Sequence, residues 1–128
     1  MIFSLNKSLS NMQDYHDLLV WKEAFAFVKL IYRLSSHFPK EEMFGITSQL
    51  RRAVVSVVAN IVEGRGKNSD KDFLRFLYIS KGSLNECQCY LELVLELKFI
   101  NKEQFMFIDN KRKQVGYLLF KLIKSLEK

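Results

Sequence analysis

The sequence predicts an all-α fold, namely an antiparallel up-down-up-down four-helix bundle. Apolar residues recur at helical spacing in four segments, and the 128 residues include one proline and five glycines, most of them at segment ends. The connections between the four segments are short, which makes neighbouring helices antiparallel. A hydrophobic content of 48% is enough for one core. We therefore expect one bundle domain over residues 15–128, preceded by a flexible tail over residues 1–14.

The first predicted helix runs from about His16 to Ser36. Steps of three and four residues separate its apolar side chains, as a core-facing helix surface requires. These side chains are Leu18, Trp21, Phe25, Val28 and Tyr32. Pro39 and Gly45 then mark a connection to the next helix.

The second predicted helix, over residues 47–64, carries two stripes at helical spacing. The apolar stripe, which we expect to face the core, is Leu50, Val54, Val57 and Ile61. The polar stripe, on another face, is Gln49, Arg52, Ser56, Asn60 and Glu63. Short neutral side chains favour packing against a neighbouring helix, and a solvated face is the alternative. The helix ends near Gly64 and Gly66, where glycine favours the left-handed turn that closes a helix.

The third predicted helix opens at Ser69, because Ser69 and Asp72 have the spacing of a capping box. Its seam alternates steps of four and three residues, with one polar interruption, through Phe73, Leu77, Ser80, Leu84, Cys87, Leu91 and Val94. The fourth predicted helix runs from about Lys102 to Leu126. Its apolar stripe, interrupted by Arg112, is Phe105, Ile108, Val115, Leu119, Leu122 and Leu126.

We expect an ion pair between Arg52 and Glu86, across the second and third helices. Glu86 follows Gly82 and Ser83, small residues that let two helix backbones approach closely, and Ser83 or Asn60 would assist the pair. Desolvation of two charges offsets most of their attraction, so the pair would set register and specificity rather than add net stability.

The sequence has more apolar surface than one bundle core can use. Around residues 73–79 apolar side chains occupy most of the helix circumference, and Phe25, Phe27, Phe107 and Phe120 add to them. A helix that is apolar on all sides needs a second partner surface in a soluble protein. The residues themselves thus indicate self-association.

Four segments resemble a family of small four-helix-bundle proteins first noticed as reading frames inside intervening sequences of bacterial 23S rRNA genes. These segments are Leu19–Ala24, Phe38–Ile46, Thr47–Gly64 and Lys81–Glu86, and the resemblance extends from Tyr15 to about Leu126. One departure is Ala59, at or beside which the family often carries proline, so a proline kink is not implied for this chain. The resemblance implies an all-α bundle, a ring-shaped homopentamer, no catalytic activity and a role in binding nucleic acid.

No combination of side chains in the sequence predicts an enzyme. His16 and His37 flank the first helix, and neither belongs to a motif that pairs a nucleophile with a base and an orienting acid. Cys87 and Cys89 lack the further Cys or His ligands of a metal site and indicate a reduced, cytoplasmic protein. The apolar runs are too interrupted for a membrane-spanning helix. We therefore expect no catalytic residue, cofactor, metal or membrane contact.

The net charge of +6 at pH 7 is the feature of the sequence that indicates a function. Residues 64–81 carry five basic side chains against two acidic ones, and residues 111–128 carry six against one. The candidate phosphate contacts are Arg65, Lys67, Lys71, Arg75, Lys111, Arg112 and Lys113. We expect the two clusters to lie at opposite ends of the bundle, so that repetition around a ring would be needed to form one basic band that attracts a polyanion. No aromatic side chains interleaved for base stacking are recognisable, so binding would be led by phosphate and weakly sequence-specific.

Two functions are compatible with these features. The first is an oligomer that binds nucleic acid, with structured RNA favoured. The second is a protein adaptor, because the resemblance extends to accessory factors of the reverse transcriptases of diversity-generating retroelements and implies a ring scaffold that docks such an enzyme. Solvation alone also accounts for lysine-rich helix faces, so these alternatives stay open at the level of sequence.

Overall fold

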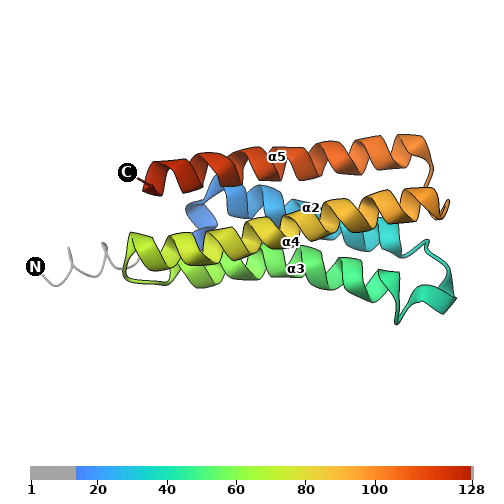
Figure 1. Cartoon of the computed structure of the whole chain (residues 1–128), viewed down its shortest axis with the longest axis horizontal. Helices are drawn as coiled ribbons and strands as arrows, with labels where there is room; N and C mark the ends of the chain where they lie inside the picture. The colour runs from blue at the N-terminus through green and yellow to red at the C-terminus, as the bar shows by residue number, and fades with distance from the viewer. Residues whose placement is uncertain (1–13, 128) are drawn as a thin grey trace, which may run out of the picture.

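Four long α-helices lie lengthwise beside one another in the computed structural model, which describes residues 14–127 (Figure 1). Over that range the elements are two short 3₁₀ turns, η1 and η2, and four α-helices, with no strand. Their bounds are η1 Tyr15–Asp17, α2 Leu19–Ser35, η2 Lys40–Glu42, α3 Ile46–Arg65, α4 Asp70–Glu96 and α5 Lys102–Leu126. α2 and α4 each contact both α3 and α5, so the helices enclose a common core. The predicted all-α bundle is confirmed, whereas the predicted tail, apart from Asp14, lies outside the described residues.

The buried faces of α3 and α4 are those that the sequence pattern predicts. Leu50, Val54, Val57 and Ile61 are fully buried. All seven predicted seam residues of α4 are buried as well, including the polar Ser80. The Ser80 hydroxyl donates a hydrogen bond of 2.8 Å to the carbonyl oxygen of Val57. Ser80 is therefore accommodated in the core because its hydroxyl has a partner on the neighbouring helix.

The predicted core face of α2 was wrong in part, since Leu18, Trp21 and Val28 are only half-buried against the core. The buried residues are Val20, Ala24, Phe27, Ile31 and Ser35, whereas Phe25 and Tyr32 are exposed. A shift of one residue rotates the face by about 100°. Both faces are apolar in sequence, but the small Ala24 fits the core. Trp21 packs at the edge of the core and stacks on the exposed Phe25, with ring centroids 5.0 Å apart. The helix also begins at Leu19 rather than His16, because η1 precedes it.

Gly64 allows α3 and α4 to approach closely where the chain turns between them. A Cβ atom at Gly64 would lie 2.8 Å from the Cβ of Phe76 and 2.9 Å from Cδ1 of Phe73. The predicted left-handed glycine turn was wrong, since none of the described glycines has a positive φ and Gly66 has φ −80°. Close packing, rather than turn geometry, is what requires glycine at position 64.

Side-chain caps begin the last two helices. The Ser69 hydroxyl accepts a hydrogen bond of 3.1 Å from the backbone N–H of Asp72, as the sequence predicted for α4. α5 begins with a full capping box that the sequence analysis missed, in which Asn101 and Gln104 each accept a 2.8 Å hydrogen bond from the other's backbone N–H. Each cap satisfies backbone donors that the first turn of a helix leaves without an intrahelical partner.

Candidate nucleic-acid interface

The beginning of α4 and the end of α5 lie at the same end of the molecule (Figure 1). The Tyr78 hydroxyl of α4 donates a hydrogen bond to the Glu127 carboxylate, which directly follows α5. The expectation that the two basic clusters occupy opposite ends was therefore wrong. Because α5 runs back along α4, the last turns of α5 lie beside the first turns of α4. The basic residues near the end of α5 therefore lie at the same end of the molecule as those near the start of α4.

Exposed lysine and arginine side chains occur on the first half of α4 and on the last turns of α5. Those of α4 are Lys71, Arg75 and Lys81, and those of α5 are Lys121 and Lys124. Lys124 Nζ lies 3.5 Å from Oε1 of Glu127. Lys71 and Arg75 belong to the predicted phosphate contacts, and the structure leaves both exposed.

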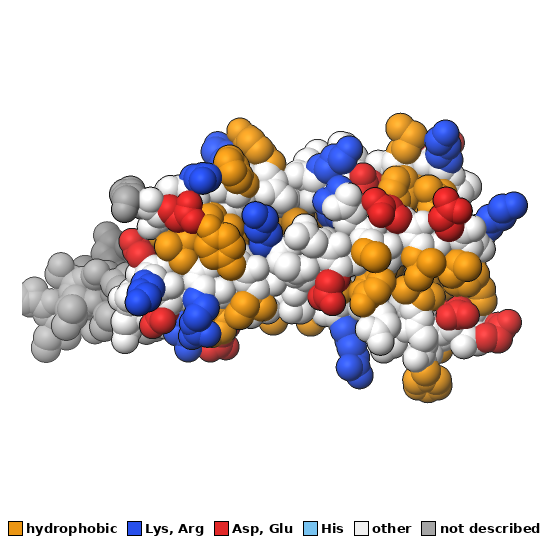
Figure 2. Space-filling view, viewed as in Figure 1, with side chains coloured by type: hydrophobic (Ala, Val, Ile, Leu, Met, Phe, Trp, Pro, Cys, Tyr) orange, Lys and Arg blue, Asp and Glu red, His pale blue; other side chains and the backbone are white. Residues whose placement is uncertain are grey.

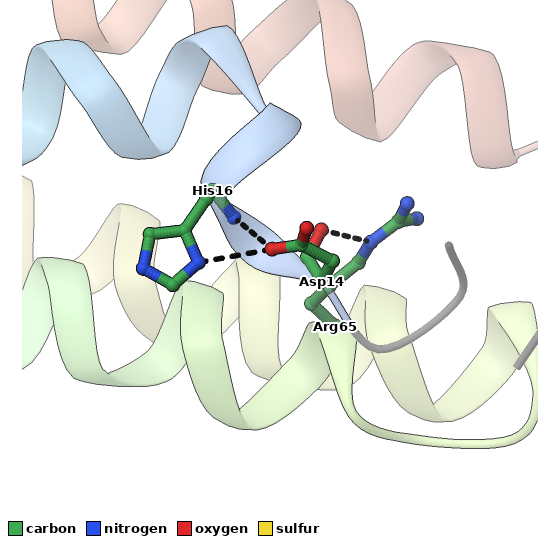
Figure 3. A network of polar contacts seen from close by, with 3 residues as sticks. All are labelled: Asp14, His16 and Arg65. Atoms are coloured by element: carbon green, nitrogen blue, oxygen red, sulfur yellow. Dashed lines mark hydrogen bonds and ion pairs between the residues drawn. The ribbon is translucent and has the colours of Figure 1, made fainter. Parts of the chain in front are cut away.

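Arg65 and Lys67 are half-buried and have partners within the chain. Arg65 Nε donates a hydrogen bond of 3.5 Å to the backbone carbonyl of Asp14 (Figure 3). In the same network, the Asp14 carboxylate accepts a hydrogen bond from the His16 backbone N–H and contacts His16 Nδ1, both at 2.9 Å. The backbone hydrogen bond, followed by the side-chain contact, lowers the pKa of Asp14. Lys67 Nζ lies 3.2 Å from Oε2 of Glu63, so this carboxylate offsets part of the charge of Lys67.

Arg112 does not act as an exposed phosphate contact, because it is buried, with an exposed fraction of 9%. Its Nε donates a 2.7 Å hydrogen bond to Asp109 Oδ1, three residues earlier on α5. The other oxygen of Asp109 lies 3.8 Å from Nζ of the exposed Lys113. Lys111 is half-buried, with Nζ 5.9 Å from the centroid of Phe107. One carboxylate thus offsets part of the charge of the cluster at residues 111–113.

The polar stripe of α3 is packed in its middle and solvated at its ends. One of the Ser56 and Ser83 hydroxyls donates to the other at 2.8 Å, and Asn60 Nδ2 donates to the backbone and side-chain oxygens of Ser56 at 2.8 and 3.0 Å. Gln49, Arg52 and Glu63 are exposed. The stripe therefore combines both of the alternatives that the sequence left open.

The expected ion pair between Arg52 and Glu86 was wrong. It is absent from the ion pairs among residues 14–127, and both side chains are exposed. The uncharged Ser56–Ser83 contact connects α3 and α4 instead. Hydroxyl groups suit this position because they avoid the desolvation cost of two buried charges.

The structure pairs exposed aromatic rings with lysines on α4 and α5, an arrangement that the sequence analysis did not identify. Lysine Nζ atoms lie 5.9 Å from the ring centroid for Lys81 over Tyr78, 5.5 Å for Lys121 over Tyr117 and 5.6 Å for Lys124 over Phe120. Figure 2 shows Lys and Arg side chains beside exposed hydrophobic ones on this face. The signal in the sequence was the spacing of an aromatic residue and a lysine four residues apart, repeated along the last helix.

A groove of about 190 Å³ lies between α4 and α5 at this surface. Its polar and aromatic lining consists of Tyr78, Lys81, Asn85, Arg112, Phe120 and Lys124. The groove contains two exposed aromatic rings, two exposed ammonium groups and one buried guanidinium. An anionic group attached to a flat ring matches this lining in charge and in shape.

The residues considered for metal or nucleophilic chemistry are dispersed or buried. Across residues 14–127 no group of three or more His, Cys, Asp and Glu side chains is arranged to hold a metal ion. Cys87 is buried, and desolvation, together with the charge of Glu86, raises the pKa of its thiol to about 12. Cys89 is exposed. No helix within the same range is long and apolar enough to cross a membrane.

The chain is similar to known proteins both in sequence and in structure. The family model described as "23S rRNA-intervening sequence protein" matches residues 16–121. Among solved structures, the chain is similar to a protein of unknown function from the S23 ribosomal protein family of Bacteroides thetaiotaomicron. The two are 29% identical, the match covers 83% of this chain and 99% of the other, and the TM-score is 0.77. No curated protein matches this chain.

Proposed function

This chain belongs to the 23S rRNA-intervening sequence protein family, and from that premise we propose that it is a non-enzymatic, cytoplasmic protein that binds nucleic acid, with structured RNA favoured. Binding is led by phosphate and weakly sequence-specific. One observation carries the proposal: Lys71 and Arg75 of α4 and Lys124 of α5 are exposed, and the helix segments that carry them lie at the same end of the molecule, from which we infer a shared basic surface. Such a surface attracts a polyanion and releases its counterions on contact.

We propose further that the chain is an antiparallel up-down-up-down bundle that assembles as a ring-shaped homo-oligomer, with a pentamer favoured by the family resemblance. Exposed apolar side chains on α2, α4 and α5 support self-association, among them Phe25, Ile79 and Phe107. Patches of this kind mark protein contacts on soluble proteins. A ring repeats the basic surface once per subunit, which strengthens the attraction for a polyanion.

Light scattering on the purified protein, with and without a structured RNA at low and moderate salt, tests both parts because it reads mass and binding together. We expect an oligomer that takes up RNA at low salt and releases it steeply as salt rises. Reversing two charges with Lys71→Glu and Arg75→Glu should weaken binding and lower the salt slope by about one per lost contact. The matched control reverses Lys40 and Lys102, exposed cations at the other end of the molecule, and should bind almost as the parent does. Equal losses in both variants would contradict the localised surface.

A second candidate function is that of a protein adaptor, for example one that docks a reverse transcriptase. The observation that favours it is Phe44, which is 97% exposed in the connection before α3, next to the exposed Met43. An apolar pair presented to solvent matches a protein partner better than a polyanion. An oligomer that ignores RNA in the scattering experiment would place this function ahead.

A further inference from the structure

The groove between α4 and α5 differs from the rest of the basic surface because aromatic rings and cations share one concave space. Phe120 is 53% exposed and Tyr78 is 46% exposed, so each ring offers a face to a ligand. Lys124 and Lys81 place their ammonium groups over these two rings at 5.6 and 5.9 Å from the centroids. Phosphate alone does not need the rings, whereas a nucleobase stacks on an aromatic face.

The inner wall of the groove is held in place by buried groups. Arg112 lines the groove, and Asp109 fixes its guanidinium through the 2.7 Å hydrogen bond. Gly116 lines the groove opposite α4, and a Cβ atom there would lie 3.4 Å from Cδ2 of Leu84. The small residue leaves a recess between the two helices, and the Arg112 guanidinium, paired with Asp109, forms part of its wall.

The Glu127 carboxylate contacts the groove from outside. It accepts the hydrogen bond of the Tyr78 hydroxyl and pairs with Lys124, two residues that line the groove. The Tyr78 hydrogen bond, with the nearby charges of Lys124 and Lys81, lowers the pKa of Glu127 and keeps the carboxylate ionised. Glu127 therefore holds groups that an incoming phosphate would also contact.

We propose that the α4–α5 groove is a site for one unpaired nucleotide of RNA, with the base stacked on Phe120 and the phosphate held by Lys81 and Lys124 in place of Glu127. The inference rests on the proposed function and adds a preference for single-stranded segments. Structured RNA supplies such nucleotides in loops and bulges, where unstacked bases are accessible to aromatic side chains. Glu127 acts as an internal competitor that lowers the affinity of the groove for phosphate.

Fluorescence anisotropy with a short labelled oligouridylate and an RNA duplex of matched length tests the site. We expect the single strand to bind more tightly than the duplex. Phe120→Leu, which removes the stacking face at an exposed position, should weaken single-strand binding roughly 5- to 150-fold and leave duplex binding and its salt slope unchanged. The control Phe44→Leu makes the same change at a ring that is 97% exposed and lies outside the groove, and should have little effect on RNA binding.

Removal of the Glu127 charge tests the site through a gain, rather than a loss, of affinity for RNA. Glu127→Gln should tighten oligouridylate binding severalfold more than Glu96→Gln does, although both variants change the net charge equally and Glu96 is exposed at the far end of α4. Equal affinity for strand and duplex, with no effect of Phe120→Leu, would overturn the nucleotide site while leaving phosphate-led binding intact. An absence of binding to either RNA would overturn the proposed function as well.

Discussion

Ser56 of α3 and Ser83 of α4 share a hydrogen bond of 2.8 Å between their hydroxyl oxygens, near the middle of the interface between the two helices. Ser83 is buried, and Asn60 extends the contact by donating to the hydroxyl oxygen of Ser56 at 3.0 Å. Small hydroxyl side chains let the helices approach while each polar atom keeps a partner.

Replacing Ser56 with alanine should destabilise the protein by about 1–3 kcal/mol, because the buried Ser83 hydroxyl loses its partner. Chemical denaturation of Ser56→Ala, Ser83→Ala and the double variant measures the coupling between the residues. The double variant should lose clearly less than the sum of the single losses. Strict additivity would show that the hydrogen bond carries no coupling energy. Ser125→Ala, at an exposed position on α5, serves as the control and should change stability little.

Gly64 and Gly82 predict opposite effects of the same substitution. Gly64→Ala places a Cβ 2.8 Å from the Cβ of Phe76, and we expect a loss of about 1–3 kcal/mol from overpacking. Gly82→Ala meets no atom within 4 Å and lies inside α4. It should raise stability by about 0.5–1 kcal/mol, because alanine loses less backbone entropy in a helix. Thermal denaturation of both variants checks the signs, and a stable Gly64→Ala protein would contradict the close approach of α3 and α4.

Lys98 has φ 62°, a left-handed conformation in which a side chain is strained. This residue closes α4, where the Phe99 N–H donates to the Val94 carbonyl at 2.9 Å. Lys98→Gly should stabilise the protein by up to about 1 kcal/mol, because glycine adopts this conformation without a Cβ clash. Lys113→Gly, inside α5, should instead destabilise it by about 0.5–1 kcal/mol. Urea denaturation midpoints distinguish the two, and a lower midpoint for Lys98→Gly would argue against a strained turn.

The two thiols should differ in reactivity. Burial raises the pKa of Cys87 to about 12, so at pH 8 this thiol is protonated and inaccessible. We expect one thiol, Cys89, to react rapidly with a colorimetric disulfide reagent in the folded protein, and two to react in denaturant. Cys89→Ser should abolish the rapid phase, and a remaining rapid phase would show that Cys87 is accessible. The raised pKa also predicts that stability declines as pH rises above about 9, where the thiol of the unfolded chain ionises while that of the folded chain stays neutral.

Local periodicity was sufficient to predict the seam of α4 and the core stripe of α3. The heptad spacing continues through Leu84 and Leu91, beyond the first turns of α4 where most of the circumference is apolar, so the pattern allows one orientation. The start of α5 at Lys102 also agreed with the sequence, and the capping box of Asn101 and Gln104 supplies the physical reason. The face of α2 could not be predicted this way, because its apolar side chains cover a wide arc of the helix. Trp21 and Phe25 lie on one side of that arc and Phe27 and Ile31 on the other, and periodicity does not show which side is buried.

The candidate site could be predicted only in part from the sequence. Lys71 and Arg75 are exposed as predicted, but the burial of Arg112 follows from its contact with Asp109 and from the space between α4 and α5. Asp109 stands three residues before Arg112, a spacing that indicates a helical ion pair and was available in the sequence. The expectation of separated basic clusters was wrong because it ignored how a returning helix aligns its end with the beginning of its neighbour.

The sequence by itself determined the fold class, the family, the core faces of α3 and α4 and the excess of basic side chains. These properties depend on composition and on spacing within single helices, where one side of each helix is distinct from the other. Only the tertiary structure decided which face of α2 is buried, which cations have internal partners and where aromatic rings and lysines of α4 and α5 form one groove. Those outcomes depend on which helices are neighbours and how closely they pack, so the residues that carry them are far apart in the chain.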